Sequence, residues 1–189
     1  MRRHRNEVRI IAGRWRGRRL RFPAEAGIRP TPDRVRETLF NWLQGVIVGA
    51  RCLDLFAGSG ALGIEALSRG ADSAVLVERN PRVAAYLRDT LAQLQTGAGE
   101  VQQVEAAAFL RRAGRRFDVV FLDPPFAEDA LAPLLQELVR GGQLAAGARV
   151  YIEHAARGGP PPLPPGFELH RSKRAGEVGY HLLAWHAAA

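Results

Sequence analysis

The stretch that decides the fold is Asp54-Leu55-Phe56-Ala57-Gly58-Ser59-Gly60-Ala61-Leu62-Gly63. It starts within a predicted strand, residues 51–56, and runs into a predicted helix, residues 60–69. The spacing of the three glycines is typical of the turn between the first strand and first helix of a nucleotide-binding α/β fold. Glu78 ends the next predicted strand, 20 residues beyond Gly58, where such folds hold a ribose. The stretch predicts a doubly wound α/β protein that binds a ligand at one edge of its sheet.

Strands and helices alternate through the rest of the chain. The predicted strands are 51–56, 74–78, 100–104, 117–123 and 148–154, and the predicted helices between them are 60–69, 81–95, 106–113 and 128–140. Because such crossovers are right-handed, this order predicts a parallel sheet with helices on both faces. Two more strands, 167–172 and 178–185, turn near Gly176 and add an antiparallel edge hairpin. We therefore expect a doubly wound, mostly parallel sheet of seven strands.

Two further elements precede this sheet. Residues 8–22 predict a short basic hairpin with Gly17 in its turn. Thr31-Pro32-Asp33 is typical of a helix start, with Thr31 as N-cap, Pro32 at the first helical position and Asp33 complementing the helix dipole. Apolar residues then recur at helical spacing, so this helix is predicted to run to about Gln44.

The charge of the chain is concentrated at one end. The 189 residues carry a net charge of +8, and Lys173 is the single lysine among 27 basic residues. Residues 1–36 hold twelve arginines and three acidic residues, so the remainder is close to neutral. A basic arm on a neutral body favours a polyanionic partner. Arginines interleaved with an aromatic residue suit RNA, although Trp15 can also pack on the body. The candidate RNA contacts are Arg9, Arg14, Trp15, Arg16, Arg18, Arg19 and Arg29.

The acidic residue at the start of the glycine loop separates two classes of ligand. A dinucleotide would bring a pyrophosphate to this loop, and Asp54 would repel it. S-adenosylmethionine has no phosphate, its ammonium group can pair with Asp54, and its carboxylate can meet the helix start near Ala61. Asp54 together with Asp123 therefore favours the methyl donor. The candidate donor-binding residues are Asp54, Phe56, Ala57, Gly58, Ser59, Gly60, Glu78, Arg79, Glu105, Ala106 and Asp123.

A second motif, Asp123-Pro124-Pro125-Phe126, ends the predicted strand 117–123. Proline has no N–H and pushes the preceding residue into an extended conformation, so the Asp123 side chain and the Pro124 carbonyl can act as acceptors. Two acceptors would hold the N–H groups of an exocyclic amine, and Phe126 would stack on its base. The first and fourth strands of a doubly wound sheet are neighbours, so we expect Asp54 and Asp123 to lie close together. The four residues are the candidate catalytic set.

The chain resembles the RsmD-type methyltransferases, a family that methylates N2 of a guanine in 16S ribosomal RNA. The resemblance covers nearly the whole chain, and it is carried by residues 9–18, 29–31, 33–43, 54–67, Glu78, 123–126, 151–153, Lys173, Gly176, Val178 and Tyr180. It implies a Rossmann-like class I methyltransferase that uses S-adenosylmethionine and modifies RNA within the small ribosomal subunit or its assembly intermediate. We expect a basic arm, residues 1–28, that contacts RNA and a methyltransferase domain, residues 29–189. Glu105 departs from the Asp or Asn of related enzymes.

Other functions remain open at the level of the sequence. Because many amino-methylating enzymes share the glycine loop and the Asp-Pro-Pro-Phe motif, a DNA adenine-N6 methyltransferase and a protein glutamine-N5 methyltransferase are the nearest alternatives. The first usually needs more residues for duplex recognition, and the second would prefer Asn at position 123. A nicotinamide oxidoreductase is disfavoured by Asp54, and a non-catalytic RNA-binding module is disfavoured by the intact motif. The motifs alone do not choose guanine N2 over adenine N6.

Composition excludes several other classes of protein. No apolar run approaches the roughly 18 residues that span a membrane, and no apolar signal-peptide core follows the basic N-terminus. Cys52 is the only cysteine, and the five histidines show no metal-ligand spacing. We expect a cytoplasmic monomer that needs no metal.

Overall fold

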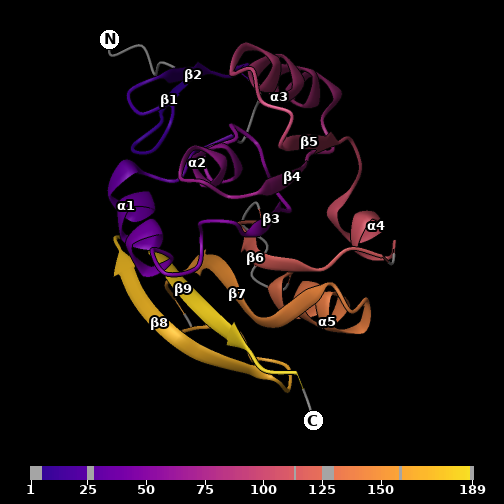
Figure 1. Ribbon diagram of the computed structural model, residues 1–189. Helices are drawn as coiled ribbons and strands as arrows, with labels where there is room; N and C mark the ends of the chain where they lie inside the picture. The colour runs from indigo at the N-terminus through magenta and orange to yellow at the C-terminus, as the bar shows by residue number, and fades with distance from the viewer. Residues whose placement is uncertain (1–5, 25–27, 113, 125–129, 158, 188–189) are drawn as a thin grey trace.

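A seven-stranded sheet forms the centre of the computed structural model, which describes residues 6–24, 28–112, 114–124, 130–157 and 159–187. Its strands are β3 (Arg51–Asp54), β4 (Ser73–Val77), β5 (Gly99–Gln102), β6 (Phe117–Leu122), β7 (Leu144–Ala155), β8 (Phe167–Ala175) and β9 (Val178–Trp185). Their order across the sheet is β5-β4-β3-β6-β7-β9-β8, with β9 antiparallel to both of its neighbours. The predicted doubly wound sheet with an antiparallel edge hairpin is confirmed (Figure 1).

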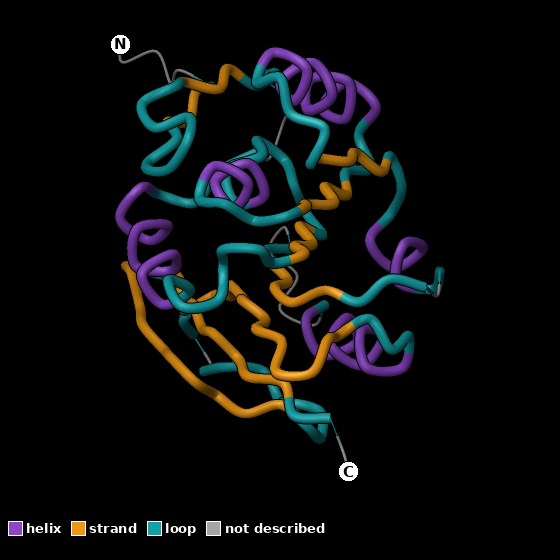
Figure 2. The backbone as a smooth tube through the Cα atoms, in the orientation of Figure 1, coloured by secondary structure: helices purple, strands orange, loops and turns teal. Residues whose placement is uncertain are grey.

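Helices cover both faces of this sheet (Figure 2). The helices are α1 (Asp33–Trp42), α2 (Gly63–Ser68), α3 (Pro81–Gln93), α4 (Ala106–Leu110) and α5 (Leu131–Arg140). Buried residues of α1, α2 and α3 form one hydrophobic cluster with one face of the sheet, and those of α4 and α5 form a second cluster with the other face. Strand residues alternate between the two clusters, so Val119 and Phe121 face α1 and α2 while Val120 and Leu122 face α5.

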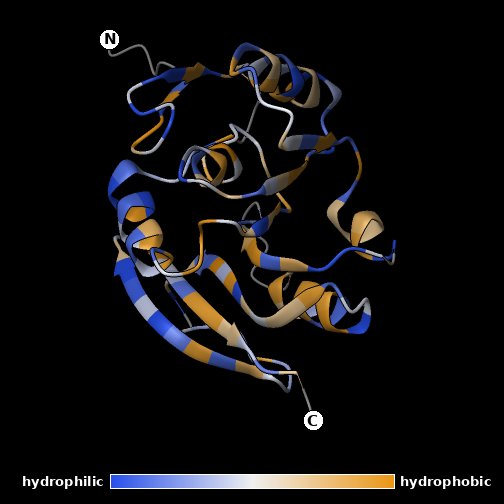
Figure 3. Cartoon of the chain, viewed as in Figure 1, coloured by the Kyte–Doolittle hydropathy of each residue, from blue (hydrophilic) through white to orange (hydrophobic). Residues whose placement is uncertain are grey.

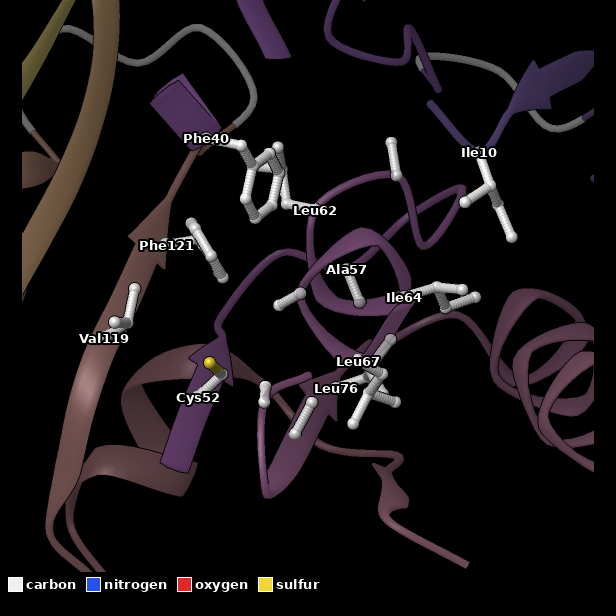
Figure 4. Packing of buried hydrophobic residues seen from close by; sticks show 14 of the residues in the cluster. Ile10, Phe40, Cys52, Ala57, Leu62, Ile64, Leu67, Leu76, Val119 and Phe121 are labelled. Carbon is white, nitrogen blue, oxygen red and sulfur yellow. The ribbon is translucent and has the colours of Figure 1, made fainter. Parts of the chain in front are cut away.

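The close packing of the first cluster explains the nearly continuous apolar sequence of the central strands. Cys52, Leu76, Val119 and Phe121 from three strands meet Ile64 and Leu67 of α2 and Phe40 of α1 (Figure 4). All seven side chains are less than 9% exposed. The outer strand β8 differs, because most of its residues are exposed and hydrophilic (Figure 3). None of the described helices is long and apolar enough to cross a membrane.

The register of the parallel strands brings three acidic residues to one edge of the sheet. β3 pairs with both β4 and β6, with Asp54 opposite Leu76 and Phe121. β6 pairs in turn with β7, with Leu122 opposite Ile152. Asp123 and Glu153 follow these two partners directly and so lie beside each other where β6 ends. The expected proximity of Asp54 and Asp123 follows from this order of strands.

The N-terminal hairpin, β1 (Glu7–Arg9) and β2 (Arg19–Arg21), packs directly on the body. The buried Glu65 carboxylate of α2 accepts hydrogen bonds from the backbone N–H groups of Ile11 and Ala12, at 2.8 and 3.0 Å. Ser68, one turn along α2, donates its hydroxyl to the Ala12 carbonyl at 2.6 Å and accepts from the Trp15 amide. The hairpin is therefore fixed by polar contacts at its base as well as by apolar contacts.

The start of α1 differs from the prediction. The residue that caps the helix is Pro32, and no side chain caps its first turn. Thr31 is not the N-cap, and its hydroxyl donates instead to the carboxylate of Glu153 on β7 at 3.1 Å. The helix ends at Trp42, two residues before the predicted end at Gln44. The Thr31 hydroxyl thus bonds to Glu153, a residue distant in sequence, and does not cap the helix as the local sequence predicts.

Most other boundaries differ by a few residues. β7 starts four residues before the predicted strand, and β8 runs three residues further than predicted. The helix of the glycine loop starts at Gly63, not at residue 60, because the chain turns tightly at Gly58 and Gly60, which have positive φ angles. Residues 128–129 of the fourth crossover helix lie outside the described residues, and α5 begins at Leu131.

Candidate active site

A cavity of about 480 Å³ opens at the carboxyl edge of the sheet. Its volume is within the range of small-molecule sites. The wall is built from the ends of β3, β4, β6 and β7, the loops that follow β3 and β5, and residues 28–32 before α1. Most of the predicted donor-binding and catalytic residues line it: Asp54, Phe56, Ala57, Gly58, Ser59, Glu78, Arg79, Glu105, Ala106, Asp123 and Pro124.

One of the predicted residues, Gly60, is not part of this wall. Gly60 lies beneath the loop, where a Cβ would approach Ile64 Cδ1 to 2.6 Å, so its role is to allow close packing of the loop on α2. Pro125 and Phe126 lie outside the described residues. The predicted stacking of Phe126 on a base therefore stays a prediction.

Asp54 is the most deeply buried acidic group of the cavity, at 3% exposure. Its Oδ2 accepts a hydrogen bond from the Gly63 amide at 2.9 Å, so the carboxylate itself occupies the start of α2. Burial raises the pKa of Asp54 to about 7, the nearby Glu78 adds to this rise, and the amides of Gly63 and Phe56 oppose it. A cation placed against this carboxylate would stabilise its ionised form, which burial disfavours.

Glu78 is positioned by two backbone amides. Its Oε2 accepts from the Gly58 amide at 3.1 Å and its Oε1 accepts from the Asn80 amide at 2.8 Å. The carboxylate thereby ties the glycine loop after β3 to the start of α3. Each carboxylate oxygen can accept a second hydrogen bond, so Glu78 still has the acceptors that two adjacent hydroxyl groups need.

Glu105 lies on the far side of the cavity with its side chain turned to solvent. Its carboxylate is 3.6 Å from the Arg79 guanidinium, and both side chains are mostly exposed. Ala106, the first residue of α4, is buried beside it. This wall offers an apolar surface and backbone groups to a planar ring, while the Glu105–Arg79 ion pair lies at the entrance.

Asp123 shares its end of the cavity with a second carboxylate, Glu153. Glu153 is 9% exposed, and its Oε1 accepts from the Tyr151 hydroxyl at 2.7 Å and from the Thr31 hydroxyl at 3.1 Å. Burial and the negative charges of Glu153 and Asp54 raise the pKa of Asp123 well above its usual value, and the Thr31 hydroxyl opposes this rise. Burial also raises the pKa of Glu153, against the effect of its two hydroxyl donors. The acidic end of the cavity is thus a connected group of side chains.

The predicted RNA contacts are mostly at the surface. Arg9, Arg14, Arg16, Arg18, Arg19 and Arg29 are exposed. Arg9 pairs with Asp33 at 3.3 Å and Arg19 pairs with Glu7 at 2.6 Å, while Arg29 also lines the cavity. Trp15 departs from the expected stacking on RNA, because its ring is 6% exposed within the first hydrophobic cluster. It serves in this structure as an anchor of the hairpin.

The sequence assigned no place in the site to Glu153, Thr31 or Glu65. Glu153 lies near the end of a buried strand beside β6, directly after the last residue paired with it, so the rule that identified Asp54 and Asp123 could also have found it. The helix-start pattern concealed the contact that Thr31 makes. Glu65 carries no local signal, because its partners Ile11 and Ala12 lie more than 50 residues away.

The sheet order, the glycine loop after the first parallel strand and the acidic residues at the ends of β3, β4 and β6 define a Rossmann-like methyltransferase. A family model described as conserved hypothetical protein 95 matches residues 8–184. Ribosomal RNA small subunit methyltransferase D of Escherichia coli is 49% identical over 176 residues, which are 93% of this chain and 89% of that protein. The Haemophilus influenzae protein of the same name is 41% identical over 93% of both chains.

A solved structure shows that this similarity extends to the fold. The structure of yhhF from Escherichia coli superposes with a TM-score of 0.91 at 48% identity, covering 96% of this chain and 99% of that one. The chain belongs to the RsmD family of methyltransferases.

Proposed function

We propose that the protein transfers a methyl group from S-adenosylmethionine to N2 of a guanine in 16S ribosomal RNA, within the small subunit or its assembly intermediate. The observation that carries the proposal is the convergence of Asp54, Glu78 and Asp123 on one cavity of about 480 Å³. The names of the relatives, ribosomal RNA small subunit methyltransferase D, support the class of substrate. The choice of guanine N2 rests on the family resemblance.

The donor set of the cavity fits S-adenosylmethionine. Asp54 offers a buried carboxylate for an ammonium group, and Glu78 offers oxygens for two ribose hydroxyls. Val104 and Ala106 offer an apolar wall for adenine. When bound, the donor supplies an electrophilic methyl group on a sulfonium. A pyrophosphate fits this cavity poorly, because Asp54, Glu78 and Asp123 are all acidic.

The acceptor amine would be held by Asp123 and the Pro124 carbonyl. The lone pair of an exocyclic amine is delocalised into its ring, so the amine needs orientation before it can attack. Two acceptors that bind both N–H groups direct the lone pair toward the methyl group and favour the positive charge that develops on nitrogen. A base in structured RNA must first leave its stack to reach this cavity.

The exposed arginines of the arm would bind the backbone of the same RNA. Arg29 lines the cavity and the hairpin that carries Arg14, Arg16 and Arg18 packs on α2, so both parts of the basic surface lie on elements in contact with the methyltransferase body. We infer a division of labour in which residues 1–28 contact RNA and residues 29–189 carry out methyl transfer.

One experiment tests the proposal directly. Labelled methyl transfer is measured side by side on small subunits, naked 16S RNA, DNA and bulk protein, and the modified nucleoside is identified after digestion. We expect N2-methylguanosine from the ribosomal substrates, with Asp123→Ala as the inactive control. Methylation of adenine N6, or of DNA or protein in preference to ribosomal RNA, would overturn the proposed substrate.

A further inference from the structure

Glu153 is a buried acidic residue in contact with the acceptor end of the cavity. It lies beside Asp123 on the neighbouring parallel strand, since Leu122 and Ile152 are register partners. Both known hydrogen bonds of its side chain, from Tyr151 at 2.7 Å and from Thr31 at 3.1 Å, reach the same oxygen, Oε1. Glu153 is buried and Asp123 is half-buried, and two such carboxyl groups on adjacent strands repel each other when both are ionised, so this arrangement is costly unless it serves a purpose.

We propose that Glu153 is a positioning residue for methyl transfer: from the neighbouring strand its charge determines whether the Asp123 carboxyl presents an acceptor or an O–H group to the amine. This inference rests on the proposed function, because it assigns Asp123 to the amine. Glu153 itself does not touch the reacting atoms. It acts through Asp123, and Tyr151 and Thr31 keep it in position.

The protonation state of Asp123 decides what it can do in the cavity. An ionised carboxyl group only accepts hydrogen bonds, whereas a protonated one also presents an O–H group. An O–H group facing an amine N–H places two donors against each other. The ionised form of Asp123 is therefore the form that orients the amine, and a negative charge at Glu153 disfavours that form.

The charged and polar groups around the two carboxyls come from β3, β7 and β9, from the loop after β4 and from the segment before α1. Asp54 at the end of β3 adds negative charge next to Asp123, and Asp54 is itself influenced by Glu78 of the loop after β4. From β7, Tyr151 donates its hydroxyl to Glu153, and on β9 Tyr180 is the register partner of Glu153. Thr31 donates a hydroxyl that favours the ionised form of both carboxyls. Of the acidic residues that the structure describes around Asp123, Asp54 and Glu78 are predicted donor contacts, whereas Glu153 is buried and is not one.

The test is Glu153→Gln, which removes the charge and keeps an oxygen that can accept from Tyr151 and Thr31. The titration of Asp123 is followed by carbon-13 NMR of labelled aspartate carboxyls, assigned with Asp123→Asn, and the pH dependence of kcat is measured in parallel. Without the neighbouring charge, Asp123 should ionise at lower pH. We expect the ratio of kcat at pH 6 to kcat at pH 8 to rise about three- to tenfold.

Two companion variants keep the test decisive. Glu137→Gln removes a carboxylate of α5 that pairs with Arg140 at the surface, and it should leave the titration and the kcat ratio unchanged. Tyr151→Phe removes one donor from the Glu153 carboxylate, so Glu153 should ionise at higher pH. With less negative charge at Glu153, the Asp123 titration should move to lower pH, in the same direction as in Glu153→Gln. This variant decides the question if Glu153→Gln does not fold.

A purely structural role predicts a different result. If Glu153 were purely structural, Glu153→Gln would lower the free energy of unfolding, and kcat would fall by a factor that is the same at every pH. The Asp123 titration would then be unchanged, and that outcome would overturn the inference. The NMR titration needs no RNA substrate, so it stands even if methyl transfer to ribosomal RNA is not found. In that case the identity of the modified nucleoside, not the titration, would contradict the proposed function.

Discussion

At the scale of single residues, the site depends on where an acidic side chain lies relative to a strand end. Asp54 and Asp123 come at or directly after the ends of β3 and β6, Glu153 follows the last residue of β7 that pairs with β6, and all three line the same cavity. Their pKa values are raised because burial penalises the charged form of each carboxyl. Perturbed carboxyls gathered in one cavity are typical of a functional site.

The role of Asp123 gives the first prediction. Asp123→Ala removes an acceptor for the amine, so methyl transfer should fall by at least about 100-fold, while donor affinity stays within about tenfold. Single-turnover methyl transfer and calorimetric donor binding measure the two quantities. Asp118→Ala is a matched control, because Asp118 lies at the other end of β6 and pairs with Arg51 at the surface. Full activity of Asp123→Ala would remove Asp123 from the catalytic set.

At the scale of elements, the N-terminal hairpin is built into the body. Its apolar residues Val8, Ile10, Trp15 and Leu20 share the cluster of α1 and α2. Arg36 of α1, only 1% exposed, donates to the Arg9 and Thr31 carbonyls and lies 3.5 Å from Glu65. The orientation of the basic surface is therefore set largely by the buried apolar residues and by Arg36 and Glu65, to which the Arg9–Asp33 ion pair adds a surface contact.

Gly13 tests how the hairpin is held. Its φ angle is +82°, and a Cβ at this position would overlap the backbone carbonyl of Ser68. Gly13→Ala should lower the free energy of unfolding by about 2–4 kcal/mol, because backbone cannot move aside as a side chain can. Gly17 is the control, since its φ is +84° but nothing lies within 4 Å of its Cβ position. Gly17→Ala should cost about 1 kcal/mol, and equal effects in urea unfolding would contradict the docking contact.

The basic surface gives a separate prediction. Reversing the charges of Arg14, Arg16 and Arg18 to Glu should weaken binding to small-subunit RNA and reduce the slope of log K against log salt by about 2–3. The matched control reverses Arg111, Arg112 and Arg116, three exposed arginines after α4 and before β6. The control has the same net charge but should keep the wild-type slope in fluorescence titrations. A slope unchanged in the hairpin variant would show that these arginines do not contact phosphate.

At the scale of the whole molecule, the buried carboxyls oppose stability at neutral pH. The folded-state pKa of Asp54, about 7, exceeds its ordinary value of 3.8, so the folded protein keeps a proton that the unfolded chain has released. As pH rises through this window the folded protein must lose that proton, and the free energy of unfolding falls. His181 acts in the opposite direction, because burial and the adjacent His154 lower its pKa to about 4.

A difference measurement isolates the carboxyl. The free energy of unfolding of Asp54→Asn minus that of the wild type should increase by about 1–3 kcal/mol between pH 5 and pH 8, since only the wild type loses the proton. Denaturant unfolding at several pH values gives both quantities, and the contribution of His181 cancels because both proteins carry it. A difference that stays constant with pH would mean that Asp54 ionises normally in the folded protein.

The sequence by itself determined the order of strands and helices, and through it the meeting of Asp54, Glu78 and Asp123. These features follow from local rules, because hydrophobic periodicity, glycine spacing and the carboxyl ends of parallel strands are read within a few residues. The burial of Trp15, the contact of Glu65 with the hairpin and the bond between Thr31 and Glu153 were decided only by the tertiary structure. Thr31 and Glu153 lie 122 residues apart, and a hydroxyl that could cap its own helix goes instead to the carboxylate that packing brings to it. A buried carboxylate without hydrogen-bond donors costs more free energy than an exposed helix end, which water can satisfy. Because packing decides which carboxylate is buried beside Thr31, the hydrogen bonds at the acidic end of the cavity could not be predicted from the sequence alone.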